Sequence, residues 1–172
     1  MANPDHLNNI ERKLIDTLRT GTYKTATGTT TAWSAGNVKV FGAFPDTEHA
    51  KYPCIIVQHV ANGQETQFSG QQMSSTTERG EIYGVGYDLY IAVDADSAFT
   101  VNGTVYKGRR LFNYLMLAAA NILMDCDFSS LTETQVLERN FSGFRDVQFD
   151  PKTEIYFADC SMIITFKNTR PT

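Results

Sequence analysis

Two pairs of aspartates are the residues of this 172-residue chain whose type and spacing could do chemistry. Asp94 and Asp96 follow an alternating apolar run, and Asp125 and Asp127 follow a long apolar segment. Carboxylates that converge from a strand end and a helix end can hold Mg²⁺ for phosphoryl transfer or nuclease chemistry. The same residues are typical of turns, and Asp125 and Asp127 would stand at the negative end of a helix dipole. A Mg²⁺-dependent nuclease that uses Asp94 and Asp96 is therefore the less favoured function.

The rest of the sequence holds no recognisable catalytic or cofactor-binding motif. His6, His49 and His59 lie in separate segments, and none belongs to an H-E-x-x-H arrangement. A nucleophile elbow of the form G-x-S-x-G and a phosphate-binding loop ending in Lys-Ser or Lys-Thr are both missing. We expect a protein that is not an enzyme and that has no metal and no cofactor.

Composition indicates one globular domain spanning residues 1–172. The chain is 42% hydrophobic and 20% charged, which suffices for a sizeable core, and its net charge of -4 gives no basic surface for wrapping nucleic acid. The first residues have neither the basic nor the apolar part of a signal peptide. Cys54, Cys126 and Cys160 stand far apart, which favours reduced, buried thiols in a cytoplasmic protein.

The elements that would position these residues are organised around a predicted helix over residues 106–126. Its apolar residues recur at helical spacing and cover nearly the whole circumference, so more than a sheet must cover it. The uncharged run 111–124 is 14 residues long, short of the ~20 that a membrane span needs. A third apolar face should therefore meet either the N-terminal helix or a neighbouring copy of the chain, and it consists of Leu117, Ala120 and Met124.

The other segments predict strands, apart from one helix over residues 5–20. The sequence favours an α+β fold, mainly an antiparallel sheet, with the long central helix and the N-terminal helix packed on one face. The segment 21–37 is expected to be a loop or a hairpin, and 168–172 a polar tail. The predicted strands are 38–44, 52–60, 82–94, a hairpin around Asn102-Gly103, a strand over 134–150 broken near 142–143, and 155–166.

A long polar connection over residues 61–81 separates two of the strongest predicted strands. A hairpin needs only two to five residues there, so a connection of this length is either mobile or put to use. Because Gln and Thr dominate it, its natural role would be to become ordered on a partner. The candidate contact residues of this loop are Gln64, Gln67, Phe68, Gln71, Gln72, Met73 and Arg79.

Several segments follow one another in a familiar order. They are T-L-R-T-G at the end of the first helix, P-C-I-I-V after a short F-P-D loop, the long polar connection, Y-D-L-Y-I-A-V-D, R-R-L-F-N-Y-L, E-R-N-F-S-G-F and Y-F-A-D-C-S-M-I-I-T-F. This layout, over nearly the whole chain, resembles the tail terminator, or tail completion, proteins of long-tailed bacteriophages. Related neck and head-completion proteins share the layout.

The resemblance implies a structural virion protein without catalytic residues. Such a protein forms a ring, usually a hexamer, on the last layer of the tail tube, stops tube growth and offers a surface to the neck. Its implied partners are copies of itself, the tail tube protein and neck or connector proteins, with the tail sheath as a further candidate. DNA would only pass through the lumen, no membrane would be involved, and the virion tail would assemble in the host cytoplasm. The alternative within this layout is a neck connector.

Overall fold

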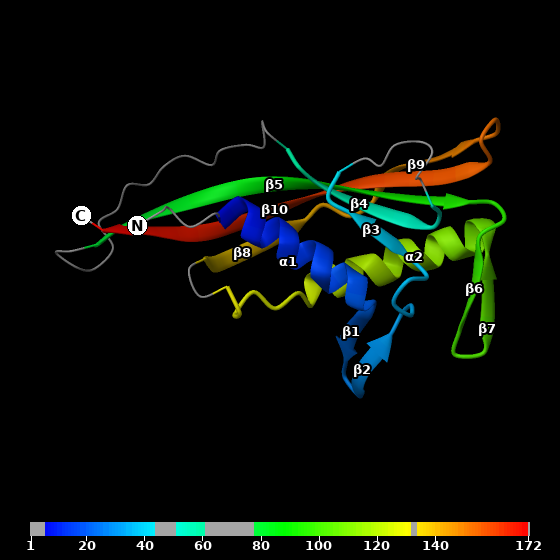
Figure 1. The fold of residues 1–172 in the computed structure, drawn as a ribbon, viewed down its shortest axis with the longest axis horizontal. Helices are drawn as coiled ribbons and strands as arrows, with labels where there is room; N and C mark the ends of the chain where they lie inside the picture. The colour runs from blue at the N-terminus through cyan, green and yellow to red at the C-terminus, as the bar shows by residue number, and fades with distance from the viewer. Residues whose placement is uncertain (1–5, 44–50, 61–77, 132–133, 172) are drawn as a thin grey trace.

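Strands dominate the described part of the chain, and two helices pack against one face of its largest sheet (Figure 1). The computed structural model describes residues 6–43, 51–60, 78–131 and 134–171, with the side chains of 78–82 and 168–171 left out of that description. The α+β fold expected from the sequence is confirmed. Its elements are α1 (His6–Thr20), β1 (Thr22–Thr25), β2 (Gly28–Thr31), β3 (Lys39–Phe41), β4 (Cys54–His59), β5 (Glu78–Asp94), β6 (Ala98–Val101), β7 (Thr104–Lys107), α2 (Gly108–Met124), β8 (Gln135–Phe141), β9 (Arg145–Asp150) and β10 (Ile155–Pro171).

The two longest strands, β5 and β10, form the centre of a six-stranded sheet. The strand order is β3-β4-β5-β10-β8, and β9 pairs with the same strand β10 farther along. β3 and β4 are parallel, whereas the other pairs of this sheet are antiparallel. The β5–β10 ladder runs from Ile155 opposite Asp94 to Pro171 opposite Glu78. It forms the long ribbon that extends past the helices to the left in Figure 1.

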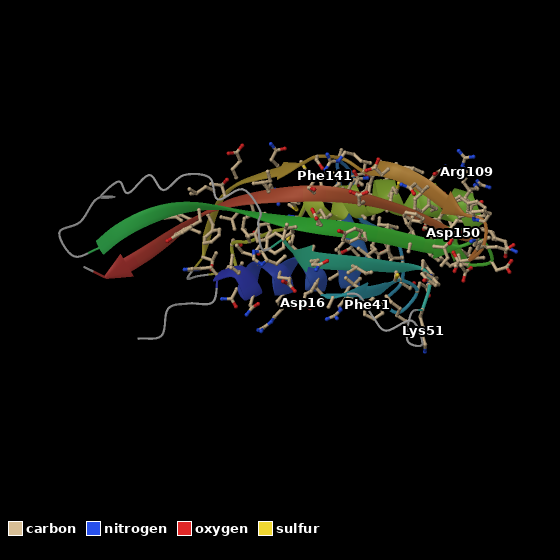
Figure 2. All side chains as sticks on the ribbon, turned by 90° about the horizontal axis from the view of Figure 1, so that it is seen from above. Asp16, Phe41, Lys51, Arg109, Phe141 and Asp150 are labelled. Atoms are coloured by element: carbon tan, nitrogen blue, oxygen red, sulfur yellow. The ribbon has the colours of Figure 1, made fainter. Side chains whose placement is uncertain are left out.

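Alternation of side chains along β5 and β10 creates the apolar face on which the helices lie. Tyr87 stands opposite Met162 and Leu89 opposite Cys160, and all four are buried. Because successive residues of a strand point to opposite faces, their neighbours two positions away join the same layer. The expectation that alternate residues of 155–166 share one face laid against the helix is therefore confirmed. Figure 2, seen from above, shows the opposite face of the sheet with both helices behind it.

The lengths of these two strands differ from the sequence expectation. The polar residues 78–81, assigned to the long loop, and 168–171, assigned to the polar tail, pair with each other at the end of the ladder. Both assignments were wrong because backbone N–H and C=O groups can continue a ladder where no apolar side chains mark it. Residues 61–77 of the predicted loop lie outside the described part of the chain.

Two small hairpins project from the helix layer on the side away from the sheet (Figure 1). In the first, β1 pairs with β2 and the chain turns at residues 26–27. In the second, β6 pairs with β7 and the chain turns at Asn102 and Gly103, whose φ angles are 48° and 79°. Positive φ at both positions is the signature of the tight hairpin turn that Asn-Gly favours, so this prediction is confirmed. Both hairpins contact α2.

Candidate subunit interface on helix α2

Helix α2 begins at a glycine for a steric reason. Gly108 has φ of 52° and its N–H donates to the Ser97 carbonyl at 3.1 Å. A Cβ atom at this position would lie 2.9 Å from the Ala95 carbonyl oxygen, so any other residue would have to move that turn. The tight contact ties the N-terminal end of α2 to the turn that follows β5.

The inner face of α2 is packed against the sheet. Leu111, Phe112, Leu115 and Ile122 are each 0% exposed. The Phe112 ring stacks on Tyr156 of β10, with the ring centroids 5.9 Å apart. This buried row accounts for the position of the helix under the β5–β10 ladder.

One flank of α2 is held by the two hairpins through Tyr114. Its hydroxyl donates to the Ala32 carbonyl at 2.8 Å, and its ring packs against Tyr106 of β7 at 4.3 Å. Burial, with smaller contributions from Tyr23 and Tyr106, raises the pKa of Tyr114 to about 12, so the hydroxyl remains a donor. Hairpins and helix therefore form one unit.

The third face of α2 is left uncovered by the rest of the described chain. Leu117 is 67% exposed and Met124 is 49% exposed, with Ala120 partly exposed between them. The N-terminal helix does not cover this face; it meets the C-terminal end of α2, where the Thr17 hydroxyl lies 3.3 Å from the Cys126 sulfur. Of the two expectations for Leu117, Ala120 and Met124, packing against α1 is thus wrong, and contact with another molecule stays a prediction.

Two further exposed apolar side chains lie on strand β9. Val147 is 56% exposed and Phe149 is 45% exposed. The Phe149 ring contacts Tyr156 at 4.5 Å, and because Phe112 stacks on the same tyrosine, Phe149 lies on the helix side of the sheet. The sequence-based expectations did not include them, although their alternation in R-D-V-Q-F-D was the available signal. Exposed apolar side chains therefore occur on β9 at the edge of the sheet as well as on α2.

Most of the candidate contact residues of the predicted loop 61–81 cannot be placed in the fold. Gln64, Gln67, Phe68, Gln71, Gln72 and Met73 lie outside the described residues. Arg79 was assigned to the same loop, but its backbone belongs to β5, where it stands opposite Arg170. The correction has the same cause as the longer ladder: polar residues pair there through their backbones.

The structure keeps the two aspartate pairs apart. Asp94 and Asp96 lie beside the start of α2 and Asp125 and Asp127 at its end, separated by a helix of 17 residues that is about 25 Å long. No group of three or more potential metal ligands occurs among the described residues. A shared Mg²⁺ site built from both pairs therefore has no geometric basis.

Each aspartate instead stabilises a turn or a neighbouring backbone group. Asp94 accepts the N–H of Asp96 at 2.8 Å, and the Asp96 carboxylate pairs with Lys107 Nζ at 3.1 Å. Asp125 accepts the backbone N–H of Lys24, and Asp127 accepts that of Ser129 at 2.9 Å. The hydrogen bonds from Ser129, aided by the nearby lysines 13 and 24, lower the pKa of Asp127. These roles are those of ordinary turn residues.

An open cavity of about 810 Å³ lies between the segment after α2 and strand β8. Its lining combines Lys24, Asp125, Glu138 and Arg139 with apolar side chains. The Arg139 guanidinium donates to the Cys126 carbonyl, so this side chain already holds the segment that follows α2. Charges of both signs give the cavity no preference for an anionic or a cationic ligand.

The three cysteines are free and buried, as expected from the sequence. Burial raises the pKa of the Cys160 thiol from 9.0 to about 12, with smaller contributions from Asp159 and Asp88, and that of Cys54 to about 11. Because unfolded thiols ionise near the ordinary value and native ones do not, the free energy of unfolding is intact below pH about 9 and falls as pH rises toward 11–12.

We expect Cys160→Ala to flatten this alkaline decline. The variant loses native packing, so it should be less stable than wild type at pH 7, but its stability should fall less steeply above pH about 9. Urea unfolding at a series of pH values from about 7 to about 10.5 checks the slope. An alkaline slope identical to that of wild type would show that ionisation of this thiol is not the cause.

In comparisons with known proteins, no family model matches the chain and no curated protein is significantly similar to it. Neither α1 nor α2, the helices of the described residues, has both the length and the apolar character needed to cross a membrane.

Proposed function

We propose that this protein is a structural assembly protein of a bacteriophage tail, which forms a ring on the last layer of the tail tube, ends tube growth and provides the surface that joins the neck. The observation that carries the assembly role is the uncovered stripe on α2, with Leu117 67% and Met124 49% exposed. Large contiguous apolar patches are rare on monomeric proteins and mark interaction sites. The tail-terminator layout of the chain supports the more specific role.

Two features of the fold suit a ring-forming subunit. The β5–β10 ribbon extends beyond the helices and offers a long surface for contacts with a tube or a neighbour (Figure 1). The sheet also ends in strands with one unpaired side among the described residues, β3 at one edge and β8 with β9 at the other. Free strand edges are available for pairing with another chain.

Incubation of the purified protein with phage tail tubes and with portal or neck complexes tests the role directly. We expect electron microscopy to show rings at one end of the tubes and no binding to isolated portals. Binding to portals alone would instead favour the neck connector, and a protein that ignores both preparations would contradict a role in the tail.

We expect Leu117→Asp to prevent assembly and leave the fold intact. The side chain is 67% exposed, so aspartate costs the monomer only its lower helix propensity, about 0.7 kcal/mol or less. A charge buried in an interface without a partner is far more costly. Light scattering should then report the 19.2 kDa monomer where wild type gives a multiple of that mass.

Leu7→Asp is the matched control for this variant. Leu7 is a 39% exposed leucine of the other helix, and its variant should assemble like wild type. Circular dichroism of both variants should match wild type. An unfolded Leu117→Asp protein, or one that assembles normally, would contradict an intermolecular contact at this face.

A further inference from the structure

We propose that the exposed face of α2 binds the same face of a second copy, with the two helices antiparallel about a two-fold axis at Leu117. The inference concerns the face that the proposed function assigns to another copy, and it rests on that proposal only for the presence of a second copy. The two-fold geometry and the charged residues that orient the two helices go beyond the proposed function.

The exposed residues of α2 have the spacing of a helix-pairing stripe. Asn113, Leu117, Ala120 and Met124 follow one another at intervals of four, three and four residues, which places them on one line along a supercoiled helix pair. None of the four is buried in the single chain. The small Ala120 side chain next to Leu117 would allow two such helices to approach closely.

The charges at the two ends of α2 oppose the helix dipole. Arg109 and Arg110 lie in the first turn, which contains no acidic residue, and Asp125 and Asp127 follow the last turn, which contains no basic one. The N-terminal end also lacks a capping hydrogen bond from the Lys107 side chain. Anions stabilise the start of a helix and cations its end, so the helix dipole disfavours this arrangement within one copy, although Ser129 and the nearby lysines 13 and 24 stabilise the Asp127 carboxylate.

Antiparallel pairing turns this arrangement into an attraction. Arg109 lies eight residues before Leu117 and Asp125 eight residues after it, about 12 Å to either side of the proposed axis. A two-fold axis at Leu117 therefore brings the arginine end of each helix to the aspartate end of the other. Neither Arg109 nor Arg110 forms an ion pair within the described residues, and the Arg110 guanidinium lies over the Tyr106 ring, 5.1 Å from its centroid.

The symmetry of this contact has a consequence for assembly. A two-fold contact closes on itself and uses the same patch on both copies, so it joins subunits in pairs and cannot by itself extend around a ring. In the proposed ring, α2 would join the copies into pairs that already form in solution, and the contacts between pairs would form on the tube through other surfaces, such as the strand edges.

Cysteine cross-linking tests the two-fold geometry. Leu117→Cys should form a disulfide-linked dimer on mild oxidation, because residue 117 of one copy would face residue 117 of the other. The native thiols are buried, so they should contribute little background. Leu7→Cys, on the other helix, is the control and should remain a monomer under the same conditions.

A second cross-link separates the antiparallel from the parallel arrangement. Arg109→Cys and Asp125→Cys proteins should each cross-link poorly alone and form a mixed dimer when combined. Efficient disulfide formation between two copies of the Arg109→Cys protein would overturn the inference. Failure of Leu117→Cys to cross-link at any concentration would overturn it as well. If rings still formed on tail tubes in that case, the proposed function would stand and only the two-fold contact would be wrong.

Reversing the charges supplies a measurement that a purely apolar contact would not change. Arg109→Glu with Arg110→Glu should weaken dimerisation by roughly tenfold or more, although acidic residues at this helix start should not reduce the thermal stability of the monomer. Adding Asp125→Arg and Asp127→Arg to the same chain should restore the dimer, and sedimentation at low and high salt would report both effects. Equal dimerisation of wild type and the doubly reversed arginine variant would contradict the proposed charge pairing.

Discussion

Replacing Phe112 with alanine should remove about 3–5 kcal/mol from the free energy of unfolding. The ring is 0% exposed and stacks on Tyr156 at 5.9 Å, where it joins α2 to the central strand of the sheet. Truncation therefore removes apolar burial and leaves a cavity between the two layers. Because a domain of this size has a total stability of about 5–15 kcal/mol, the variant should lose a large part of it.

Leu117→Ala is the matched control on the same helix. Its side chain is 67% exposed, so its truncation should change the stability of the monomer by about 0.5 kcal/mol or less. Urea unfolding of both variants, at protein concentrations low enough to keep wild type monomeric, separates folding from assembly. Equal losses in the two variants would contradict the assignment of inner and outer faces to α2.

Gly21→Ala should be the second strongly destabilising change, by about 2–5 kcal/mol from backbone strain and overpacking together. Gly21 ends α1 with φ of 63°, and its N–H donates to the Leu18 carbonyl at 3.1 Å. A Cβ atom there would lie 2.3 Å from the Trp33 carbonyl oxygen and 2.5 Å from Cδ1 of its ring. Either Trp33 or the end of α1 has to move.

The consequence of moving Trp33 reaches beyond the turn. The Trp33 indole N–H donates to the Leu18 carbonyl at 3.2 Å, and the neighbouring Ala32 carbonyl accepts the hydroxyl of Tyr114 on α2. Trp33 is the only tryptophan of the chain and is 2% exposed. Its fluorescence emission should therefore shift to longer wavelength in Gly21→Ala at the same time as the unfolding midpoint falls.

Gly28→Ala separates the effect of backbone strain from the effect of the clash with Trp33. Gly28 has φ of 138°, and a Cβ atom added there would meet no atom of the described residues within 4 Å, so its variant has backbone strain without a clash. We expect a smaller loss of stability and unchanged tryptophan emission. If Gly28→Ala and Gly21→Ala behaved alike, the close approach of Trp33 would not be the reason for glycine at position 21.

The assembly proposal and these stability predictions depend on opposite faces of one helix. The inner face of α2 determines whether the chain folds, and the outer face should determine what it binds. Variants of Phe112 and Leu117 are therefore expected to separate in stability and in mass. A Leu117 variant that keeps its stability and loses the oligomeric mass would be direct evidence for an intermolecular role of α2.

Much of the fold could be predicted from local patterns. Alternation predicted the inward-facing residues from Tyr87 to Val93 and along β10, helical spacing predicted α2, and Asn102-Gly103 predicted a hairpin. These predictions succeeded because the period of apolar residues follows directly from strand and helix geometry. The extension of β5 and β10 to Glu78 and Pro171 was missed, because backbone pairing does not require apolar side chains.

The sequence by itself determined that α2 is apolar on nearly all sides and that the chain holds no familiar catalytic motif. Only the tertiary structure decided which side of α2 remains uncovered, that Val147 and Phe149 are also exposed, and that the aspartate pairs stand at opposite ends of the helix. The physical reason is that periodicity records the direction of a side chain along its own element, whereas burial and proximity depend on neighbours that are distant in the chain.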